Sequence, residues 1–191
     1  MHSGNDLSKA SFGRSLLVLG GARSGKSRHA QALAEAVAMA DGVRLVFVAT
    51  AQAFDDEMTD RIALHRADRD DRWQTIEAPV RLAEALTNAD APDAVILVDC
   101  LTLWLSNLLL ADIPIDREVD ALLAAVATLN GRVILVSNEV GSGIVPDNAL
   151  ARRFRDAAGI MHQRLAANLD TVDLVIAGLV QRLKAPAGAA I

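Results

Sequence analysis

A glycine-rich segment near the N-terminus has residue types and a spacing that could hold phosphate groups. It consists of Gly20, Gly21, Ala22, Arg23, Ser24, Gly25, Lys26 and Ser27. The segment matches the pattern G-x-x-x-x-G-K-[ST], in which backbone N–H groups point at a phosphate, the lysine reaches the β- and γ-phosphate oxygens, and the serine ligates Mg²⁺. A strand predicted at 16–19 and a helix predicted at 26–40 flank it, which disfavours a glycine-rich turn without a ligand. The segment therefore predicts binding of GTP or ATP.

A carboxylate that could serve the metal follows another apolar run. Asp99 comes directly after the predicted strand 94–98, and a carboxylate at the end of a neighbouring strand commonly holds Mg²⁺ or its water shell. Asp is also frequent as the N-cap of a helix that follows a strand, so a capping role stays open. Ser27 and Asp99 are the candidate metal ligands.

One histidine lies in a basic segment that could carry nucleophilic chemistry. His65 stands among the arginines of the segment 61–69. Neutral imidazole can attack phosphorus, and arginines could neutralise the phosphates during attack. From these residues alone, a solvated histidine on a charged helix face is the alternative.

Polar and glycine residues at 138–146, after the predicted strand 132–136, suit a ligand-facing loop, although a plain connector has the same composition. Arg152, Arg153 and Arg155 on the next helix could meet phosphate or a partner subunit, and a solvated basic face is the alternative.

The order of apolar runs predicts an α/β fold. Runs rich in Val, Leu and Ile predict buried strands at 16–19, 44–49, 94–98, 132–136 and 174–177. Segments with helical spacing separate or follow them at 26–40, 55–67, 80–89, 101–110, 116–129 and 148–169. Strands that are apolar on both faces favour a mostly parallel central sheet between helices, the three-layer P-loop NTPase fold, with ligands beyond the carboxyl ends of the strands.

Length and composition limit the remaining choices. The 191 residues predict one catalytic domain at 15–184, with flexible tails at 1–14 and 185–191. A net charge of -5 argues against nucleic acid as a partner. A single cysteine, Cys100, fits a reducing cytoplasm, and the sequence shows neither a signal peptide nor an apolar stretch long enough for membrane insertion.

Several ordered blocks resemble one family, the bifunctional adenosylcobinamide kinase / adenosylcobinamide-phosphate guanylyltransferases of cobalamin biosynthesis. The resemblance covers residues 16 to about 184. The blocks are GGARSGKSRHA (20–30), VATAQAFDDEM (48–58), RIALHRADR (61–69), WQTIE (73–77), VDCLTLWLSNLL (98–109), SNEVGSGIVPDNALARRFRDAAG (137–159) and AGLVQRLK (177–184).

The resemblance implies a homo-oligomer, a trimer, with two activities. It phosphorylates adenosylcobinamide with ATP or GTP, and then transfers GMP from GTP to adenosylcobinamide phosphate through a covalent GMP-histidine intermediate. His65 takes the place of the family's histidine, and Lys26 stabilises the charge of the departing pyrophosphate. The nucleotide contacts that the resemblance implies are residues 20–27, Thr50, Ala51, Gln52, Arg66, Ala67, Asp68, Arg69, Glu77 and Asp99.

Two other functions use the same loop. A different small-molecule kinase would need Lys26, Ser27 and Asp99 but no covalent step at His65. A nucleotide-dependent switch ATPase would couple hydrolysis to a partner protein instead of modifying a small molecule.

Overall fold

A computed structural model describes residues 12–52 and 70–188 of the 191-residue chain. Its elements are β1 (Ser15–Gly20), α1 (Lys26–Asp41), β2 (Arg44–Ala49), β3 (Trp73–Glu77), α3 (Leu82–Ala89), β4 (Ala94–Asp99), α4 (Leu101–Leu110), α5 (Ile115–Thr128), β5 (Arg132–Asn138), α6 (Ala149–Asn168), β6 (Thr171–Ile176) and β7 (Leu179–Lys184). The predicted helix at 55–67 lies outside the described residues.

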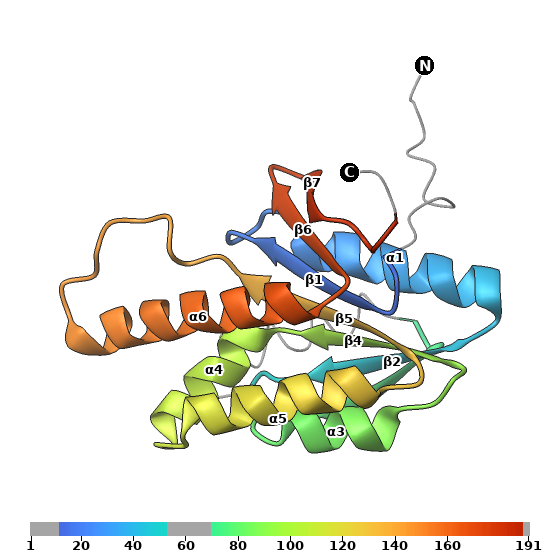
Figure 1. Ribbon diagram of the computed structural model, residues 1–191, viewed down its shortest axis with the longest axis horizontal. Coiled ribbons are helices and arrows are strands. Elements are labelled where there is room, and N and C mark those ends of the chain that lie inside the picture. Colours follow the sequence, from blue (N-terminus) through green and yellow to red (C-terminus); the bar gives the residue numbers. More distant parts are fainter. Residues whose placement is uncertain (1–11, 53–69, 189–191) are drawn as a thin grey trace.

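Seven strands form one sheet in the order β3-β2-β4-β5-β1-β6-β7. All neighbouring strands run parallel except β6 and β7, which are antiparallel. Helix α1 packs on one face, and α3, α4, α5 and α6 pack on the other, so the sheet is the middle of three layers (Figure 1). The predicted α/β fold with a mostly parallel sheet is confirmed.

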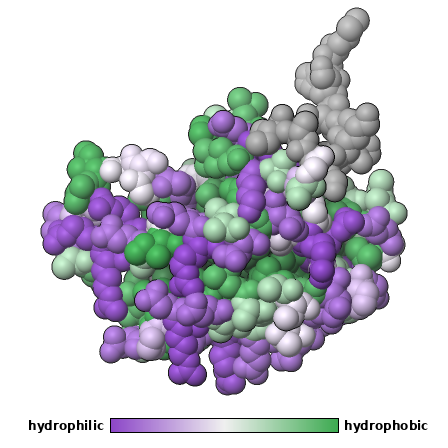
Figure 2. Space-filling model, in the orientation of Figure 1, coloured by the Kyte–Doolittle hydropathy of each residue, from purple (hydrophilic) through white to green (hydrophobic). Residues whose placement is uncertain are grey.

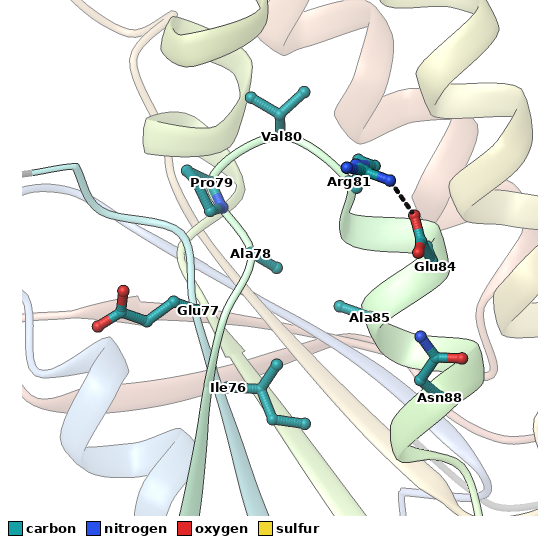
Figure 3. Close-up of a pocket in the computed structure, with 9 residues that line it drawn as sticks. All are labelled: Ile76, Glu77, Ala78, Pro79, Val80, Arg81, Glu84, Ala85 and Asn88. Carbon is teal, nitrogen blue, oxygen red and sulfur yellow. Dashed lines mark hydrogen bonds and ion pairs between the residues drawn. The ribbon is translucent and has the colours of Figure 1, made fainter.

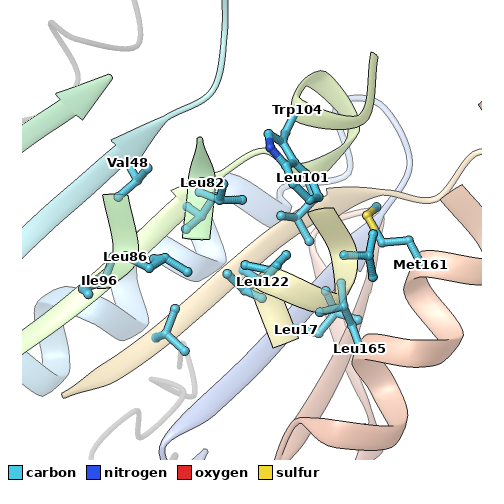
Figure 4. Packing of buried hydrophobic residues seen from close by; sticks show 14 of the residues in the cluster. Leu17, Val48, Leu82, Leu86, Ile96, Leu101, Trp104, Leu122, Met161 and Leu165 are labelled. Atoms are coloured by element: carbon cyan, nitrogen blue, oxygen red, sulfur yellow. The ribbon is translucent and has the colours of Figure 1, made fainter. Parts of the chain in front are cut away.

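The larger core lies between the sheet and the four helices of one face. Leu17 of β1 and Ile96 of β4 meet Trp104 of α4, Leu122 of α5 and Leu165 of α6, all fully buried (Figure 4). Trp104 satisfies its polar atom as well, because its indole N–H donates to the backbone oxygen of Val80 at 2.7 Å. This packing fixes α4 against the ends of the strands that carry the site.

The prediction missed two strands because both lie at sheet edges. β3 (WQTIE) and β7 (LVQRLK) contain polar residues and are largely exposed, so neither shows the continuous apolar run of a strand buried on both faces. β6 begins at Thr171, three residues before the predicted start, because Asp173 interrupts its apolar pattern. The described part of the chain contains no helix long and apolar enough to cross a membrane.

The first described residues are attached to the sheet. Phe12 is buried, and its backbone oxygen accepts a hydrogen bond from the Thr171 hydroxyl at 2.7 Å. The Asp170 carboxylate accepts from the backbone N–H groups of Arg14 and Ser15 at 2.7 and 3.1 Å. Residues 12–14, which the sequence assigned to a flexible tail, therefore have fixed partners in the domain.

A buried carboxylate joins β6 to α1 and β7. Asp173 is fully buried and accepts hydrogen bonds from His29 Nε2 at 3.0 Å and from Arg182 Nε at 2.5 Å. Burial alone would raise the pKa of Asp173, but the bonds from His29 and Arg182 outweigh it, so the pKa lies below its ordinary value.

Acid is therefore expected to destabilise the fold partly through Asp173. With its pKa lowered in the folded state, the carboxylate contributes stability above the unfolded-state pKa of about 3.9, and that contribution is lost as the pH falls through the folded-state pKa. Urea unfolding at a series of pH values should show the free energy of unfolding falling below about pH 4. The fall should be shallower in Asp173→Asn. Equal slopes in the two proteins would contradict this assignment.

Candidate active site

The phosphate loop, residues 20–27, connects β1 to α1. Gly25 has a φ of 97° in the left-handed region, where a side chain would be strained. A Cβ on Gly25 would also lie 3.4 Å from the Cα of Gly178, and the Gly178 N–H donates to the Ser24 backbone oxygen at 2.8 Å. The turn between β6 and β7 therefore supports the loop from outside, and glycine is required where the two segments meet.

The loop presents groups suited to phosphate. Lys26 is buried and directs its ammonium across the loop, where Nζ donates to the Gly21 backbone oxygen at 3.1 Å. The N-terminus of α1 has no side-chain cap, and its N–H groups favour an anion. Ser24 Oγ is buried without a hydrogen-bond partner among the described residues, as expected of a polar atom in a ligand-binding loop. These observations support the predicted triphosphate site.

Strands β3, β2 and β4 bring two of the predicted site residues into one row. Ala49 at the end of β2 is paired with Glu77 of β3 on one side and with Asp99 of β4 on the other. Ala51 and Gln52 lie two and three residues after the end of β2 and are half-buried. Because these parallel strands end at the same edge as β1, which we call the carboxyl edge, the predicted contacts of the described residues converge there.

Thr50 is held by its neighbours in a way that the sequence did not indicate. It is fully buried, and its hydroxyl donates to the Cys100 backbone oxygen at 2.7 Å while accepting from the Cys100 N–H at 2.9 Å. Asn107 of α4 donates to the backbone oxygens of Thr50 at 2.8 Å and Pro79 at 2.9 Å. One buried amide thus ties together the segments that follow β2 and β3, next to Asp99.

Replacing Asn107 by leucine should destabilise the protein and weaken nucleotide binding together. The change leaves two buried carbonyl groups without donors, which costs about 2 kcal/mol. It also releases the ends of β2 and β3, so the KM for GTP should rise. Thermal unfolding and steady-state kinetics measure the two effects, with Ser106→Ala on the same helix as the control. An unchanged unfolding midpoint would show that Asn107 does not hold these segments.

The end of β5 carries a second polar group. Asn138 is bonded to Thr102 of α4, and Ser137, one residue earlier, points to the other face, where its hydroxyl meets His162 Nε2 at 2.7 Å. Burial lowers the pKa of His162, against a smaller opposing effect of Glu139. His162 therefore favours the neutral form.

Internal hydrogen bonds shape the loop that follows β5. The Glu139 carboxylate accepts from the backbone N–H groups of Gly141 at 2.6 Å and Ser142 at 3.3 Å. Burial would raise the pKa of Glu139, but these bonds hold it below its usual value. Arg152 Nη1 donates to the backbone oxygens of Pro146 and Asp147 at 2.9 and 2.8 Å. Arg152 thus supports the loop, a role that its sequence position alone did not predict.

A cavity of about 330 Å³ lies between the end of β3 and α3. Figure 3 shows Ile76, Ala85 and Asn88 at this cavity and the Arg81–Glu84 ion pair at its side, whereas the Glu77 side chain points away from α3. The carboxylate predicted to contact nucleotide is therefore directed away from α3, on the other side of β3.

The structure describes the predicted metal ligands but not the predicted nucleophile and the residues next to it. His65, Arg66, Ala67, Asp68 and Arg69 lie outside the described residues. For the metal, the described residues include no cluster of three or more His, Cys, Asp or Glu side chains. One hydroxyl and one carboxylate, Ser27 and Asp99, still suit Mg²⁺, which usually keeps several waters and takes further ligands from phosphate.

Comparisons with known proteins agree with one another over most of the chain. The family model described as cobinamide kinase / cobinamide phosphate guanyltransferase matches residues 16–183. The bifunctional adenosylcobalamin biosynthesis protein CobP of Pseudomonas aeruginosa is 51% identical over 170 residues, which cover 88% of this chain and 96% of that protein. The bifunctional adenosylcobalamin biosynthesis protein CobU of Salmonella typhimurium is 44% identical over 184 residues, covering 88% and 99%.

A solved structure supports the fold alone. The flagellar accessory protein FlaH from Methanocaldococcus jannaschii superimposes with a TM-score of 0.51 at 12% identity, covering 91% of this chain and 79% of that one.

Proposed function

Because the chain belongs to the cobinamide kinase / cobinamide phosphate guanyltransferase family, we propose how its residues divide between the two reactions. As a member of this family it is a bifunctional enzyme of adenosylcobalamin biosynthesis that uses nucleoside triphosphates. One observation carries the assignment of residues. The phosphate loop, with the buried Lys26, opens onto the same carboxyl edge as Asp99 and Glu77.

In the kinase reaction, ATP or GTP gives its γ-phosphoryl group to the aminopropanol hydroxyl of adenosylcobinamide. The loop N–H groups and Lys26 hold the triphosphate and neutralise charge that develops on it. Ser27 and Asp99 would hold Mg²⁺, which would neutralise further charge on the triphosphate when it is bound. No covalent step on the protein is needed.

In the guanylyltransferase reaction, His65 attacks the α-phosphorus of GTP. The new bond joins an imidazole nitrogen to phosphorus, and the bond to the α–β bridging oxygen breaks, so pyrophosphate leaves. The phosphate of adenosylcobinamide phosphate then attacks the same phosphorus, which releases the histidine and gives adenosylcobinamide-GDP. Arg66, Ala67, Asp68, Arg69, Glu77 and residues 50–52 are proposed as the surrounding nucleotide contacts.

Two labels on the nucleotide test the division of function. GTP labelled at the α-phosphate should leave an acid-labile label on the protein, and ATP labelled at the γ-phosphate should label cobinamide. A kinase of a different small molecule would leave no label on the protein and none on cobinamide, because its γ-phosphoryl group would go to another small molecule. A switch ATPase would give neither, and its hydrolysis would respond to a partner protein but not to corrinoid.

We also propose that the enzyme is a homotrimer and acts in the cytoplasm, where ATP and GTP are used. Exposed apolar side chains gather on the hairpin of β6 and β7, namely Ile176, Leu179, Val180 and Leu183. The face shown in Figure 2 is largely hydrophilic over α5 and α6, with apolar surface near the β6–β7 end. Such a patch favours a subunit contact. Light scattering of the purified protein measures the number of subunits.

A further inference from the structure

Asn138 lies between the two halves of the phosphate site. It is the last residue of β5 and is paired with Gly20, the first residue of the phosphate loop. β5 also lies next to β4, whose last residue is Asp99. Asn138 is therefore positioned at the carboxyl edge, between the phosphate loop and Asp99, the proposed metal ligand.

Two neighbours fix the orientation of the Asn138 amide. Nδ2 donates to Thr102 Oγ1 at 2.7 Å, and the backbone N–H reaches the same oxygen at 3.4 Å. Thr102 Oγ1 is also 3.1 Å from Cys100 Sγ. Because the threonine oxygen accepts from Nδ2, its own hydrogen is free to point at the sulfur. In the structure Nδ2 also lies 3.8 Å from Cys100 Sγ, so the amide nitrogen faces Thr102 and Cys100 and Oδ1 lies on the opposite side.

The carbonyl end of this amide is available to a ligand. Among the described residues, none donates to Asn138 Oδ1, and the side chain is half-buried at the carboxyl edge. The backbone is fixed as well, because the N–H of Glu139 donates to the Gly20 oxygen at 3.0 Å. An oriented acceptor atom beside the phosphate loop could meet a hydroxyl group that approaches the bound triphosphate.

We propose that, in the kinase reaction, Asn138 Oδ1 accepts a hydrogen bond from the substrate hydroxyl that is to be phosphorylated. This bond directs the hydroxyl oxygen at the γ-phosphorus. Because β5 lies between β1, which leads into the phosphate loop, and β4, which ends at Asp99, a triphosphate held by the loop and directed toward Asp99 would place its γ-phosphate over the end of β5. The hydroxyl oxygen bonds to the γ-phosphorus, the bond to the β–γ bridging oxygen breaks, and the nucleoside diphosphate leaves with that electron pair. The hydroxyl proton passes to solvent. This inference rests on the proposed kinase function.

The two reactions of this enzyme provide an internal control, since only one of them breaks a bond at the γ-phosphorus. Asn138→Ala should lower kcat for cobinamide phosphorylation about 10- to 100-fold, the usual cost of a poorly oriented nucleophile. The KM for ATP and the rate of GMP attachment from α-labelled GTP should stay within about threefold. Asn138→Asp keeps an acceptor oxygen but adds negative charge, so it should recover part of kcat while raising the KM for ATP.

Asn130→Ala is the matched control, because Asn130 is exposed in the turn before β5 and bonds only with Asp90 in that region. It should leave both reactions unchanged. Equal losses of both reactions in Asn138→Ala would assign the residue a structural role, and no loss in either would exclude the contact. Either result overturns the proposal. A failure of the proposed function looks different, because wild-type protein would then neither phosphorylate cobinamide nor become labelled by GTP.

Discussion

Replacing His65 by alanine is expected to abolish the attachment of GMP to the protein while cobinamide phosphorylation stays within about threefold of wild type. In the proposed mechanism the imidazole is the nucleophile of the first guanylyl step, so its removal should cost more than about 1,000-fold. The kinase reaction uses direct transfer to a hydroxyl group and does not need the histidine. Protein-bound radioactivity from α-labelled GTP and phosphorylation by γ-labelled ATP measure the two effects in one preparation.

The matched control for His65→Ala is His2→Ala, which changes the same residue type far away in the sequence. It should be labelled like the wild type. His162 is a poor candidate for the nucleophile, because it is packed against the buried Ser137 and bonded to its hydroxyl. A label that survives in His65→Ala, or one that resists acid, would refute the GMP-histidine intermediate.

The phosphate loop was predictable because it is local. Its glycines, lysine and serine are consecutive in the chain, and the flanking strand and helix follow from apolar patterns on either side. The edge strands β3 and β7 were not predictable in this way, since an exposed strand lacks the apolar run that marks a central one. For the same reason the buried strands were found, although β6 starts three residues earlier and β5 ends two residues later than predicted.

Side-chain contacts between distant segments depend on the order of strands in space. The Thr50 hydroxyl is bonded to Cys100 because β2 and β4 are neighbours, although β3 lies between them in the sequence. A polar residue inside the apolar segment 101–110 was the one signal that pointed to Asn107. Burial predicts that such an amide has partners, but it does not identify them as the backbone oxygens of Thr50 and Pro79.

This arrangement also bears on the role of Thr50 as a nucleotide contact. Both its hydroxyl and its carbonyl oxygen are already bonded to Cys100 and Asn107. If the Thr50 hydroxyl turned to a nucleotide, it would lose its buried hydrogen bonds to the backbone of Cys100, the residue after Asp99. We therefore expect the Thr50 side chain to position the ends of β2 and β4, and the proposed nucleotide contact of residues 50–52 to be made by other groups of this segment.

Replacing Lys26 by alanine should reduce both reactions, in contrast to His65→Ala. Lys26 is buried in the loop, with Nζ 3.1 Å from the Gly21 oxygen, so in the proposed site it would contact the phosphates whichever phosphorus is attacked. In the proposed mechanism it stabilises charge on the β- and γ-phosphates in the kinase reaction and on the departing pyrophosphate in guanylyl transfer. Removal of one such positive group costs about 100- to 1,000-fold in kcat/KM.

Lys184→Ala is the matched control for Lys26→Ala, because Lys184 on β7 donates to the backbone oxygens of Ala166 and Ala167 at the end of α6. It should lower stability slightly and leave both reactions intact. Lys26→Arg keeps the positive charge but places a larger, planar group in a buried position, so it should recover less than full activity in both assays. If Lys26→Ala impaired only phosphorylation, GTP would have to be bound for guanylyl transfer without the loop, and the single shared triphosphate site would be wrong.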